Sequence, residues 1–383
     1  MKKKGMKLTV NTEAPPPAAS GITVSDTGSL RGDGITVNMQ GLTISGAAGA
    51  SQPATSSSSE IGSAWLTSTE VEHMLGEGSS GVVKLVRHKA TRQRYALKVV
   101  PLGCSEQERK QILVELRTLH GSAVSEIVAF HDAFYAEGAV HVVLEYMDCG
   151  SLAHVLQRHG PLPERLLSKI TQSVLAGLAH LHGDLKTVHR DIKPSNLLLN
   201  SRGEAKIGDF GMSGQLATSF SRLASWVGTA AYMSPERISA SDYSYEADIW
   251  SLGVSLWECA VGRYPHGTPE EDATAAAVPT EESAGAGSGG TTNHSLLPEE
   301  RRLGLSFWDL LHCIVEGDPP PLPADLAFSA PFCELVEACL AKDCAKRPRA
   351  ATLLEHSWLS EQQPHLVDLS TWLQKTHSDG PED

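Results

Sequence analysis

Four short motifs follow one another in a fixed order and restrict this chain more than any other feature of its sequence. A glycine-rich run, Gly76-Glu77-Gly78-Ser79-Ser80-Gly81-Val82-Val83, comes first, and Ala96-Leu97-Lys98 follows it. A polar run, His189-Arg190-Asp191-Ile192-Lys193-Pro194-Ser195-Asn196, and the triplet Asp209-Phe210-Gly211 come later. Each motif alone has ordinary explanations, because runs of glycine and serine also form plain turns. Together and in this order they indicate a site that binds ATP and transfers a phosphoryl group.

The hydrophobic pattern predicts a sheet followed by helices. Residues 71–100 contain three alternating apolar runs, which indicate three antiparallel strands, and residues 105–119 have capping and spacing typical of a helix. Residues 140–146 predict a further strand, and a long buried helix is expected from residue 166 onward. Strands thus give way to helices near Gly150. We therefore expect an α+β fold with a small β-rich lobe, a larger helical lobe and a cleft between them.

Composition excludes several classes of partner. The chain has 383 residues, of which 41% are hydrophobic and 20% charged, enough to bury a full core. A formal net charge of -13 argues against nucleic acid, because binding phosphate backbones needs concentrated lysine and arginine. No apolar run approaches the ~20 residues that span a bilayer, so no membrane association is expected. Seven scattered cysteines indicate reduced thiols, and we expect a protein of the cytoplasm or also the nucleus.

The chain divides into an arm, a folded body and a tail. Residues 1–68 are rich in small and polar residues, and we expect a disordered arm, in which two alternating strips at 21–24 and 34–37 could at most pair or dock on the body. Residues 69–360 form the body, with the small lobe at about 69–147 and the large lobe at about 148–360. A flexible insertion is expected at 266–303 and a short tail at 361–383.

Lys98 and Glu115 are expected to form a buried ion pair. Ala96 and Lys98 lie two apart on a strand and face the same side, so Ala96 can lie against a flat base while Lys98 reaches phosphates. Glu115 falls on the apolar face of the predicted helix, where an unpaired charge would be costly. Pairing the two groups satisfies Glu115 and orients the Lys98 ammonium, which makes a merely solvated lysine the weaker interpretation.

The polar run supplies the remaining chemistry. Asp191 is the predicted acceptor of a substrate hydroxyl proton, and Lys193 would steady the transferring phosphoryl group. Asn196 and Asp209 would hold Mg²⁺, because amide and carboxylate oxygens suit this ion. His189 is assigned a structural packing role.

Residues 70–360 resemble a eukaryotic protein kinase. The likeness adds Ser234-Pro235-Glu236 and Asp248-Ile249-Trp250-Ser251-Leu252-Gly253 to the motifs above, and it implies that Glu236 pairs with Arg347. A narrower resemblance is to the MAP kinase kinases, and it rests on these runs: Met147-Asp148-Cys149-Gly150-Ser151-Leu152, Lys193-Pro194-Ser195-Asn196, Val227-Gly228-Thr229, Tyr232-Met233-Ser234-Pro235-Glu236-Arg237 and Ala260-Val261-Gly262-Arg263-Tyr264-Pro265.

This resemblance implies the nucleotide contacts, the substrate and the partners. The ATP-binding residues would be Gly76, Glu77, Gly78, Ser79, Ser80, Gly81, Val83, Ala96, Lys98, Glu145, Met147 and Ser151. Members of the family phosphorylate both Thr and Tyr in the activation loop of a MAP kinase and are themselves activated by a MAP kinase kinase kinase. Two alternatives stay open: a serine/threonine kinase of a neighbouring family with other targets, and a pseudokinase scaffold that binds partners without transferring phosphate.

The activation segment looks like the plant form of the family. Ser219 and Ser225 have the plant spacing of two phosphorylation sites, and Ser221 is a competitor because it has the animal spacing. Phosphate there would add negative charge that can pair with Arg190 and order the loop. A serine-rich loop could also be only a solvated linker. Residues 27–44 also look like the stretch that precedes the kinase in plant and green-algal members.

Both ends of the chain resemble docking segments of the family. At the start, Lys2, Lys3 and Lys4 precede Leu8 and Val10, the pattern of a MAP kinase docking peptide, although an ordinary solvated basic tail explains it nearly as well. At the other end, residues 367–373 resemble the binding site for upstream kinases. A C-terminal helix that packs on the large lobe is an equally good interpretation.

Overall fold

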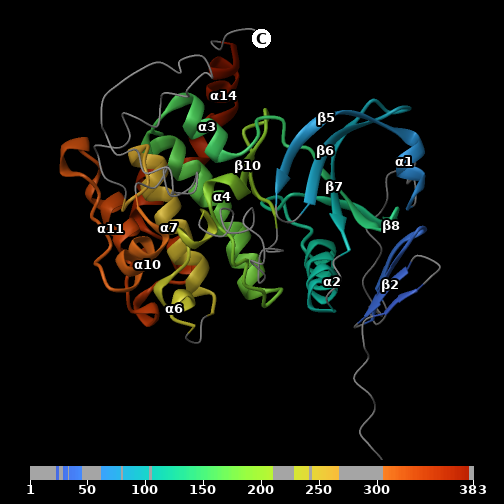
Figure 1. The fold of residues 1–383 in the computed structure, drawn as a ribbon. Coiled ribbons are helices and arrows are strands. Elements are labelled where there is room, and N and C mark those ends of the chain that lie inside the picture. Colours follow the sequence, from blue (N-terminus) through green and yellow to red (C-terminus); the bar gives the residue numbers. More distant parts are fainter. Residues whose placement is uncertain are drawn as a thin grey trace, which may run out of the picture.

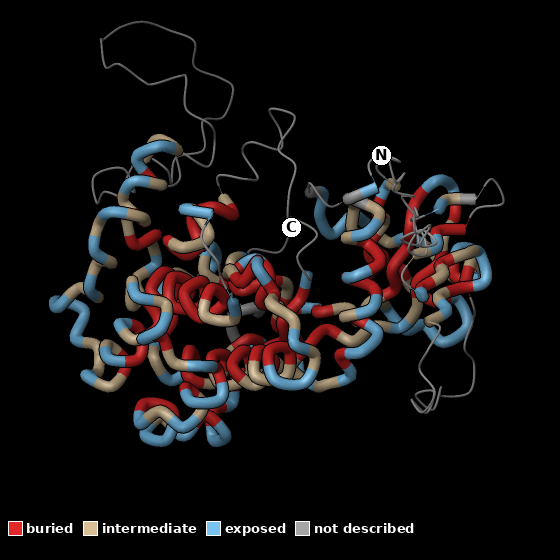
Figure 2. Tube along the Cα trace, turned by 90° about the horizontal axis from the view of Figure 1, so that it is seen from below, coloured by how far each residue is buried: buried red, intermediate tan, exposed pale blue. Residues whose placement is uncertain are grey.

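A β-rich lobe and a helical lobe lie side by side in the computed structural model (Figure 1). The structure describes residues 23–25, 29–32, 34–44, 62–78, 81–102, 106–209, 228–240, 244–266 and 305–378. Buried residues run through the middle of both lobes (Figure 2). No helix within these ranges is both long enough and apolar enough to cross a membrane. The arrangement confirms the predicted α+β fold.

Five antiparallel strands form the sheet of the small lobe in the order β5-β6-β7-β9-β8. The predicted meander is present, because β6 pairs with β5 on one side and with β7 on the other. Helix α2 (Glu106–Gly121) follows β7 and buries the expected apolar positions. The strands are β5 (Thr69–Gly78), β6 (Gly81–His88), β7 (Arg94–Pro101), β8 (Phe130–Ala136) and β9 (Ala139–Glu145).

Part of the arm that was expected to be disordered is folded. Strands β1 (Thr23–Ser25), β2 (Ser29–Gly32), β3 (Ile35–Asn38) and β4 (Gly41–Ile44) form an antiparallel sheet, which contacts α2 and β8. In the described residues the two strips overlap β1 and β3, with β2 between them, and the sheet docks on the folded body as that expectation allowed. The prediction of disorder was wrong for these residues. It relied on the low average hydrophobicity of residues 1–68, which says little about the few alternating apolar positions that form the strands. Their burial depends on a distant part of the chain.

Helix α1 (Ala64–Ser68) also belongs to the folded body rather than to a disordered arm. Its Trp65 is 8% exposed and packs in one apolar cluster with Leu97 and Phe134 of the five-stranded sheet. The indole Nε1 donates to Oδ2 of Asp132 at 3.1 Å, so the polar atom of this buried ring is satisfied. The folded region therefore begins before residue 69.

The large lobe is built around two long helices. Helix α4 (Glu164–Gly183) and helix α7 (Glu246–Val261) contact each other, and both are buried along most of their length. Helix α7 is buried on all sides from Ala247 to Ala260, so it lies in the centre of the lobe. The other elements are α3 (Leu152–His159), η1 (Pro194–Asn196), β10 (Leu197–Leu199), β11 (Ala205–Ile207), α6 (Pro235–Ile238), α10 (Phe307–Val315), η2 (Ala324–Leu326), α11 (Ala330–Cys339), η3 (Cys344–Lys346), α12 (Ala350–Leu353), α13 (Ser357–Gln362), η4 (Pro364–Leu366) and α14 (Leu369–Ser378).

The described part of the tail packs on the large lobe. Val367, Leu369 and Leu373 are 8%, 2% and 1% exposed, and Trp372 meets the ring of His159 edge to face at 5.5 Å. Of the two interpretations of this segment, the structure contains the packed helix. The predicted insertion lies outside the described residues except for its first residue, His266. The six described cysteines, all free thiols, are Cys149, Cys259, Cys313, Cys333, Cys339 and Cys344.

Candidate active site

Lys98 connects three separate elements at the junction of the lobes. It is 5% exposed and shares its face of β7 with Ala96, as the two-residue period of a strand requires. Its Nζ lies 3.4 Å from Oε1 of Glu115 on α2, so the predicted ion pair is confirmed. Nζ also donates to the carboxylate of Asp209, which follows β11. One ammonium group thus joins the sheet, α2 and the start of the activation segment.

Burial and the neighbouring charges in this cluster shift the pKa values of Lys98, Glu115 and Asp209. Burial raises the pKa of Glu115 to about 8, and although the Lys98 ammonium opposes the rise, the Asp209 carboxylate adds to it. For Lys98, burial alone would lower the pKa, but Asp209 and Glu115 raise it above its usual value. Burial would raise the pKa of Asp209, but the Lys98 ammonium lowers it. Lys98 therefore stays charged at neutral pH, and Asp209 is its stronger partner.

Asp191, Lys193 and Asn196 converge on one point of the large lobe. Lys193 Nζ lies 3.0 Å from Oδ1 of Asp191 and donates to Oγ1 of Thr229 at 3.0 Å. Asn196 Nδ2 donates to the backbone oxygen of Asp191 at 2.7 Å and to its Oδ2 at 2.8 Å. Pro194 opens the single turn η1 between them, and its fixed φ suits the first position of a helix. The turn brings Asn196 back to Asp191.

The oxygen atoms near this point fit a divalent metal ion. Nδ2 of Asn196 is engaged by Asp191, which leaves its Oδ1 as the amide atom able to bind a cation. Asp209 adds a carboxylate, and both are hard oxygen ligands. The described residues contain no group of three or more His, Cys, Asp or Glu side chains that could hold a metal ion alone. This donor set suits an ion held jointly by the protein and by phosphate groups.

The glycine-rich run is shared between the paired strands β5 and β6, and Gly78 lies opposite Gly81. Gly81 has φ +123°, and a Cβ atom there would lie 2.2 Å from the backbone oxygen of Val99, so no larger residue fits. A Cβ atom on Gly76 would meet nothing within 4 Å, which leaves open space over this strand. Val83 pairs with Lys98 across the sheet. Strand β6, which carries the end of the glycine-rich run, therefore lies directly beside the lysine.

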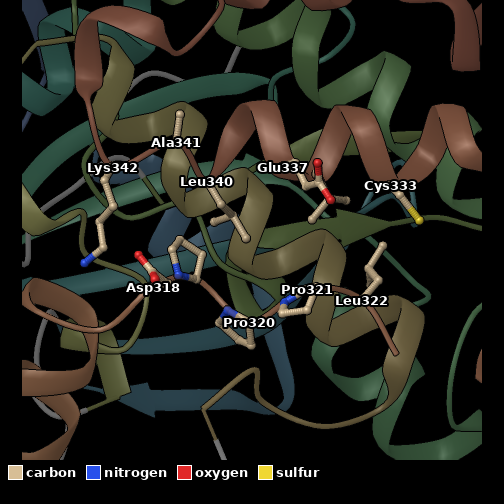
Figure 3. Close-up of a pocket in the computed structure, with 11 residues that line it drawn as sticks. Asp318, Pro320, Pro321, Leu322, Cys333, Glu337, Leu340, Ala341 and Lys342 are labelled. Carbon is tan, nitrogen blue, oxygen red and sulfur yellow. The ribbon is translucent and has the colours of Figure 1, made fainter. Parts of the chain in front are cut away.

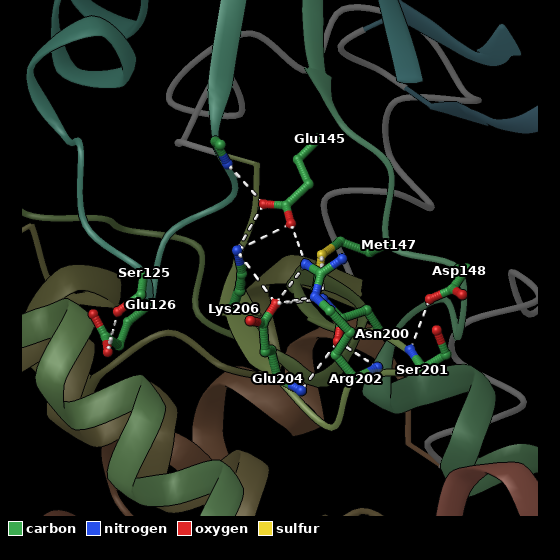
Figure 4. A network of polar contacts seen from close by, with 11 residues as sticks. Ser125, Glu126, Glu145, Met147, Asp148, Asn200, Ser201, Arg202, Glu204 and Lys206 are labelled. Atoms are coloured by element: carbon green, nitrogen blue, oxygen red, sulfur yellow. Dashed lines mark hydrogen bonds and ion pairs between the residues drawn. The ribbon is translucent and has the colours of Figure 1, made fainter. Parts of the chain in front are cut away.

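Glu145 lies at the end of β9, where the two lobes join, and its carboxylate belongs to a polar network (Figure 4). Oε2 lies 2.8 Å from Nζ of Lys206 on β11, and Oε1 lies 2.9 Å from Nη2 of Arg202. Glu204 binds the same arginine at 2.6 Å. Because its carboxylate is engaged here, a nucleotide contact of Glu145 would have to use its backbone.

Met147 and Ser151 follow in the connection between the lobes. Met147 is 5% exposed, and its backbone oxygen accepts a hydrogen bond from Gly150 at 3.1 Å. The hydroxyl of Ser151 accepts a hydrogen bond from the backbone of His154 at 3.3 Å and so caps α3. The local role of Ser151 is therefore to begin a helix.

Comparison with known proteins agrees with this geometry. The Protein kinase domain family matches residues 69–359. Mitogen-activated protein kinase kinase 1 of Arabidopsis thaliana is 41% identical over 80% of this chain and 78% of its own length. Dual specificity mitogen-activated protein kinase kinase dSOR1 of Drosophila melanogaster is 42% identical over 79% of the chain and 73% of its own. Dual specificity mitogen-activated protein kinase kinase 1 of Dictyostelium discoideum is 36% identical, and the match covers 79% of the chain and 55% of that relative.

The chain belongs to the MAP kinase kinase family of protein kinases. In this kinase the pair that the resemblance implied between Glu236 and Arg347 is present. The guanidinium makes two parallel contacts with the carboxylate, at 2.6 Å and 2.8 Å, and lies 5.0 Å from the ring centre of Trp250. The pair ties α6 to the segment that precedes α12.

Asp248 has a supporting role in this kinase that the sequence reasoning did not assign. It is fully buried at the start of α7, and its carboxylate accepts from the backbone N–H of His189 at 2.7 Å and of Arg190 at 2.8 Å. Nε2 of His182 lies 2.9 Å from the same carboxylate. Arg190 has φ +73°, a conformation that needs such support. The available signal was a carboxylate next to an apolar helical run.

His189 has the structural role that was expected. It is 2% exposed, and its Nε2 lies 3.1 Å from the backbone oxygen of Gly208, immediately before Asp209. The histidine therefore links the run that contains Asp191 to the segment that carries Asp209.

Several predicted site residues lie outside the described residues. They are Ser79, Ser80, the phosphorylation candidates Ser219, Ser221 and Ser225, and the docking candidates Lys2, Lys3, Lys4, Leu8 and Val10.

A pocket of about 350 Å³ lies on the large lobe of this kinase, and none of the predicted catalytic or ATP-binding residues lines it (Figure 3). It is bounded by the proline-rich segment after α10 and by α11. Leu322, Val336 and Leu340 line its apolar part, and Asp318 and Lys342 lie together toward one side. Lys342 donates to the last carbonyls of α10, so its charge serves to cap that helix.

Proposed function

We propose that this kinase transfers the terminal phosphoryl group of ATP to Thr and Tyr side chains in the activation loop of a MAP kinase. The observation that carries the proposal is the contact of Lys98 with both Glu115 and Asp209 at the junction of the lobes. Dual specificity appears in the names of the relatives from Drosophila and Dictyostelium. We extend that property and the MAP kinase substrate to this chain on the strength of the family.

Each site residue has a proposed task that follows from its chemistry. Lys98 binds ATP phosphates, and Glu115 orients its ammonium. Asp191 accepts the proton of the substrate hydroxyl, and Lys193, 3.0 Å away, neutralises charge on the transferring group. The backbone of the glycine-rich turn, Glu145 and Met147 would contact the rest of the nucleotide.

Mg²⁺ is the proposed metal, with Asn196 and Asp209 as its protein ligands. When bound, it would neutralise negative charge on the phosphates and help to align them. The choice of Mg²⁺ rests on an all-oxygen donor set.

Regulation is proposed to follow the family pattern. A MAP kinase kinase kinase would phosphorylate Ser219 and Ser225, with Ser221 as the competitor, and Arg190 would bind the added phosphate. Lys2, Lys3, Lys4, Leu8 and Val10 would dock on an acidic and apolar groove of the MAP kinase. We propose the cytoplasm, and also the nucleus, as the compartment, which is consistent with the six free thiols.

The decisive experiment maps phosphorylation sites on a catalytically inactive MAP kinase after incubation with the activated protein, ATP and Mg²⁺. Modification of both Thr and Tyr in its activation loop supports the proposal. Modification of serine and threonine elsewhere, with none in that loop, would assign the chain to a different kinase group. Asp191→Asn serves as the control, and equal phosphate transfer by this variant would refute the proposed site.

A further inference from the structure

The sheet formed by β1–β4 packs against the side of the small lobe where α2 lies (Figure 1). Leu30, Ile35 and Val37 are 0%, 2% and 0% exposed, although this part of the chain is poor in apolar residues. They belong to the same apolar core as Ile112 and Leu116 of α2. Strand β2 contacts α2, while β3 and β4 contact β8. The sheet therefore packs on the helix that carries Glu115.

Helix α2 is buried over a wide part of its circumference. Ile112 and Leu116 form a stripe with Glu115 beside it, and this stripe faces the core. Leu113 lies about 100° further round the helix, yet it is only 1% exposed. The next residue, Val114, is 45% exposed and marks the outer face. Because β2 and β8 both contact α2, the helix is held by neighbours from two sheets.

A second set of contacts fastens this sheet to the small lobe. The backbone oxygen of Met39, in the turn between β3 and β4, accepts from the backbone of Ser63 at 2.8 Å. Gly62 N–H donates to Oδ2 of Asp132 on β8 at 3.0 Å. Gly62 has φ +63°, and a Cβ atom there would lie 2.1 Å from the Met39 oxygen. The close approach of this turn thus depends on glycine.

We propose that the β1–β4 sheet is a positioning element that holds α2 in place and so keeps Glu115 in contact with Lys98. The contact is 3.4 Å long, close to the limit of a hydrogen bond, so a small outward shift of α2 would break it. The link to catalysis rests on the proposed function of the Lys98–Glu115 pair. Leu30 is the central positioning residue, because it is fully buried and lies on β2, the strand that contacts α2.

The test compares Leu30→Ala with Met39→Ala in the full-length protein. Met39 lies in the turn between β3 and β4, and its side chain is 49% exposed, so its truncation should leave the packing of the sheet intact. We expect Leu30→Ala to speed amide exchange in α2 but not in α4, and to lower kcat/KM for ATP about tenfold. Leu30→Ile, which keeps a buried side chain of the same size, should retain most of the wild-type amide protection of α2 and most of kcat/KM for ATP. Met39→Ala should behave like the wild type.

Gly62→Ala provides a second variant that leaves every buried apolar side chain in place. It should loosen α2 in the same way, whereas Gly160→Ala, at an open left-handed position of the large lobe, should not. Unchanged exchange in α2 in both Leu30→Ala and Gly62→Ala overturns the proposal. Faster exchange with unchanged kcat/KM overturns its link to catalysis. If even the wild type transfers no phosphate, the proposed function fails, while the exchange data still decide whether the sheet holds α2.

Discussion

Lys98 and Glu115 meet through one pair of atoms, Nζ and Oε1, 3.4 Å apart, while Oε2 of Glu115 has no hydrogen-bond partner among the described residues. Half of this buried carboxylate is therefore unsatisfied. Such a group resists ionisation, in agreement with a pKa that burial raises to about 8. The site therefore disfavours the charged form of this carboxyl group, and such a perturbed pKa is typical of functional positions.

The first prediction concerns the pH dependence of stability. In the unfolded chain Glu115 loses its proton near pH 4.5, whereas the folded protein keeps it until about pH 8. The folded state binds more protons between these values, so this residue's contribution to the free energy of unfolding is present at low pH and is lost as pH rises through about 8. Glu115→Gln should therefore flatten the decline in stability from pH 5 to pH 8.

Urea unfolding without nucleotide at several pH values measures this effect. Glu106→Gln, an exposed position at the start of the same helix, is the control and should keep the wild-type slope. Above about pH 8, where Glu115 is ionised, the same Glu115→Gln variant should transfer phosphate more slowly than the wild type, because an amide oxygen accepts a hydrogen bond from the Lys98 ammonium but does not offset its charge. An unchanged slope would mean that Glu115 is already ionised at neutral pH.

Sequence reasoning succeeded where the chemistry is local. The strand period places Lys98 and Ala96 on one face, the helix period turns Glu115 inward, and the motif around Asp191 fixes its neighbours within a few residues. It failed where burial depends on distant partners. Asp248 binds the backbone of His189 from 59 positions away, and Leu30 is buried against elements that start far along the chain. The composition of a short segment does not indicate which distant residues it will contact.

The second prediction concerns the connection between the lobes. Lys206 is 9% exposed at its side chain and binds both oxygens of Glu145, at 3.0 Å and 2.8 Å. Lys206→Met should lower the free energy of unfolding by about 1–3 kcal/mol, because a partly buried carboxylate loses a close partner. It should also raise KM for ATP several-fold, since Glu145 is one of the residues proposed to contact the nucleotide.

Arg202→Met is the matched control for this effect. Arg202 binds the same carboxylate, but its side chain is 63% exposed, so the loss should be at most about 0.5 kcal/mol. Urea unfolding and steady-state kinetics on both variants make the comparison. Equal losses of unfolding free energy in the two variants would contradict the expectation that the buried contact of Lys206 stabilises the protein more than the exposed contact of Arg202.

The third prediction concerns the pair of Arg347 and Glu236. The two terminal nitrogens of the guanidinium, Nη1 and Nη2, contact the carboxylate, and the arginine side chain is 0% exposed. Arg347→Lys should lower the free energy of unfolding by about 2 kcal/mol, because an ammonium can neither reproduce two parallel hydrogen bonds nor place a planar guanidinium over the ring of Trp250. Lys346→Met, which removes a distant and exposed contact with Asp343, should cost almost nothing. Thermal unfolding measures both variants. An unchanged unfolding temperature in Arg347→Lys would show that a positive charge alone is sufficient to hold Glu236.

The fourth prediction concerns activation. Changing Ser219 and Ser225 together to Ala should hold activity at the level of the untreated protein after incubation with the upstream kinase, because no phosphate can then pair with Arg190. Ser221→Ala is the control and should still be activated. Phosphate incorporation and activity toward the MAP kinase are measured together. Normal activation of the double variant would remove this assignment of the phosphorylation sites.

The last prediction concerns the basic start of the chain. Removing residues 1–10 takes away Lys2, Lys3 and Lys4 together with Leu8 and Val10, and it should raise KM for the intact MAP kinase several-fold. Activity on a short peptide should stay unchanged, because the peptide offers no groove for docking. Charges are screened over ~8 Å at physiological salt, so this local attraction survives a net charge of -13 and should weaken as salt rises. Lys346→Ala removes an exposed lysine that belongs to the large lobe, and it should leave both rates unchanged. Equal rates of the full and shortened proteins on the intact MAP kinase would identify the segment as an ordinary solvated tail.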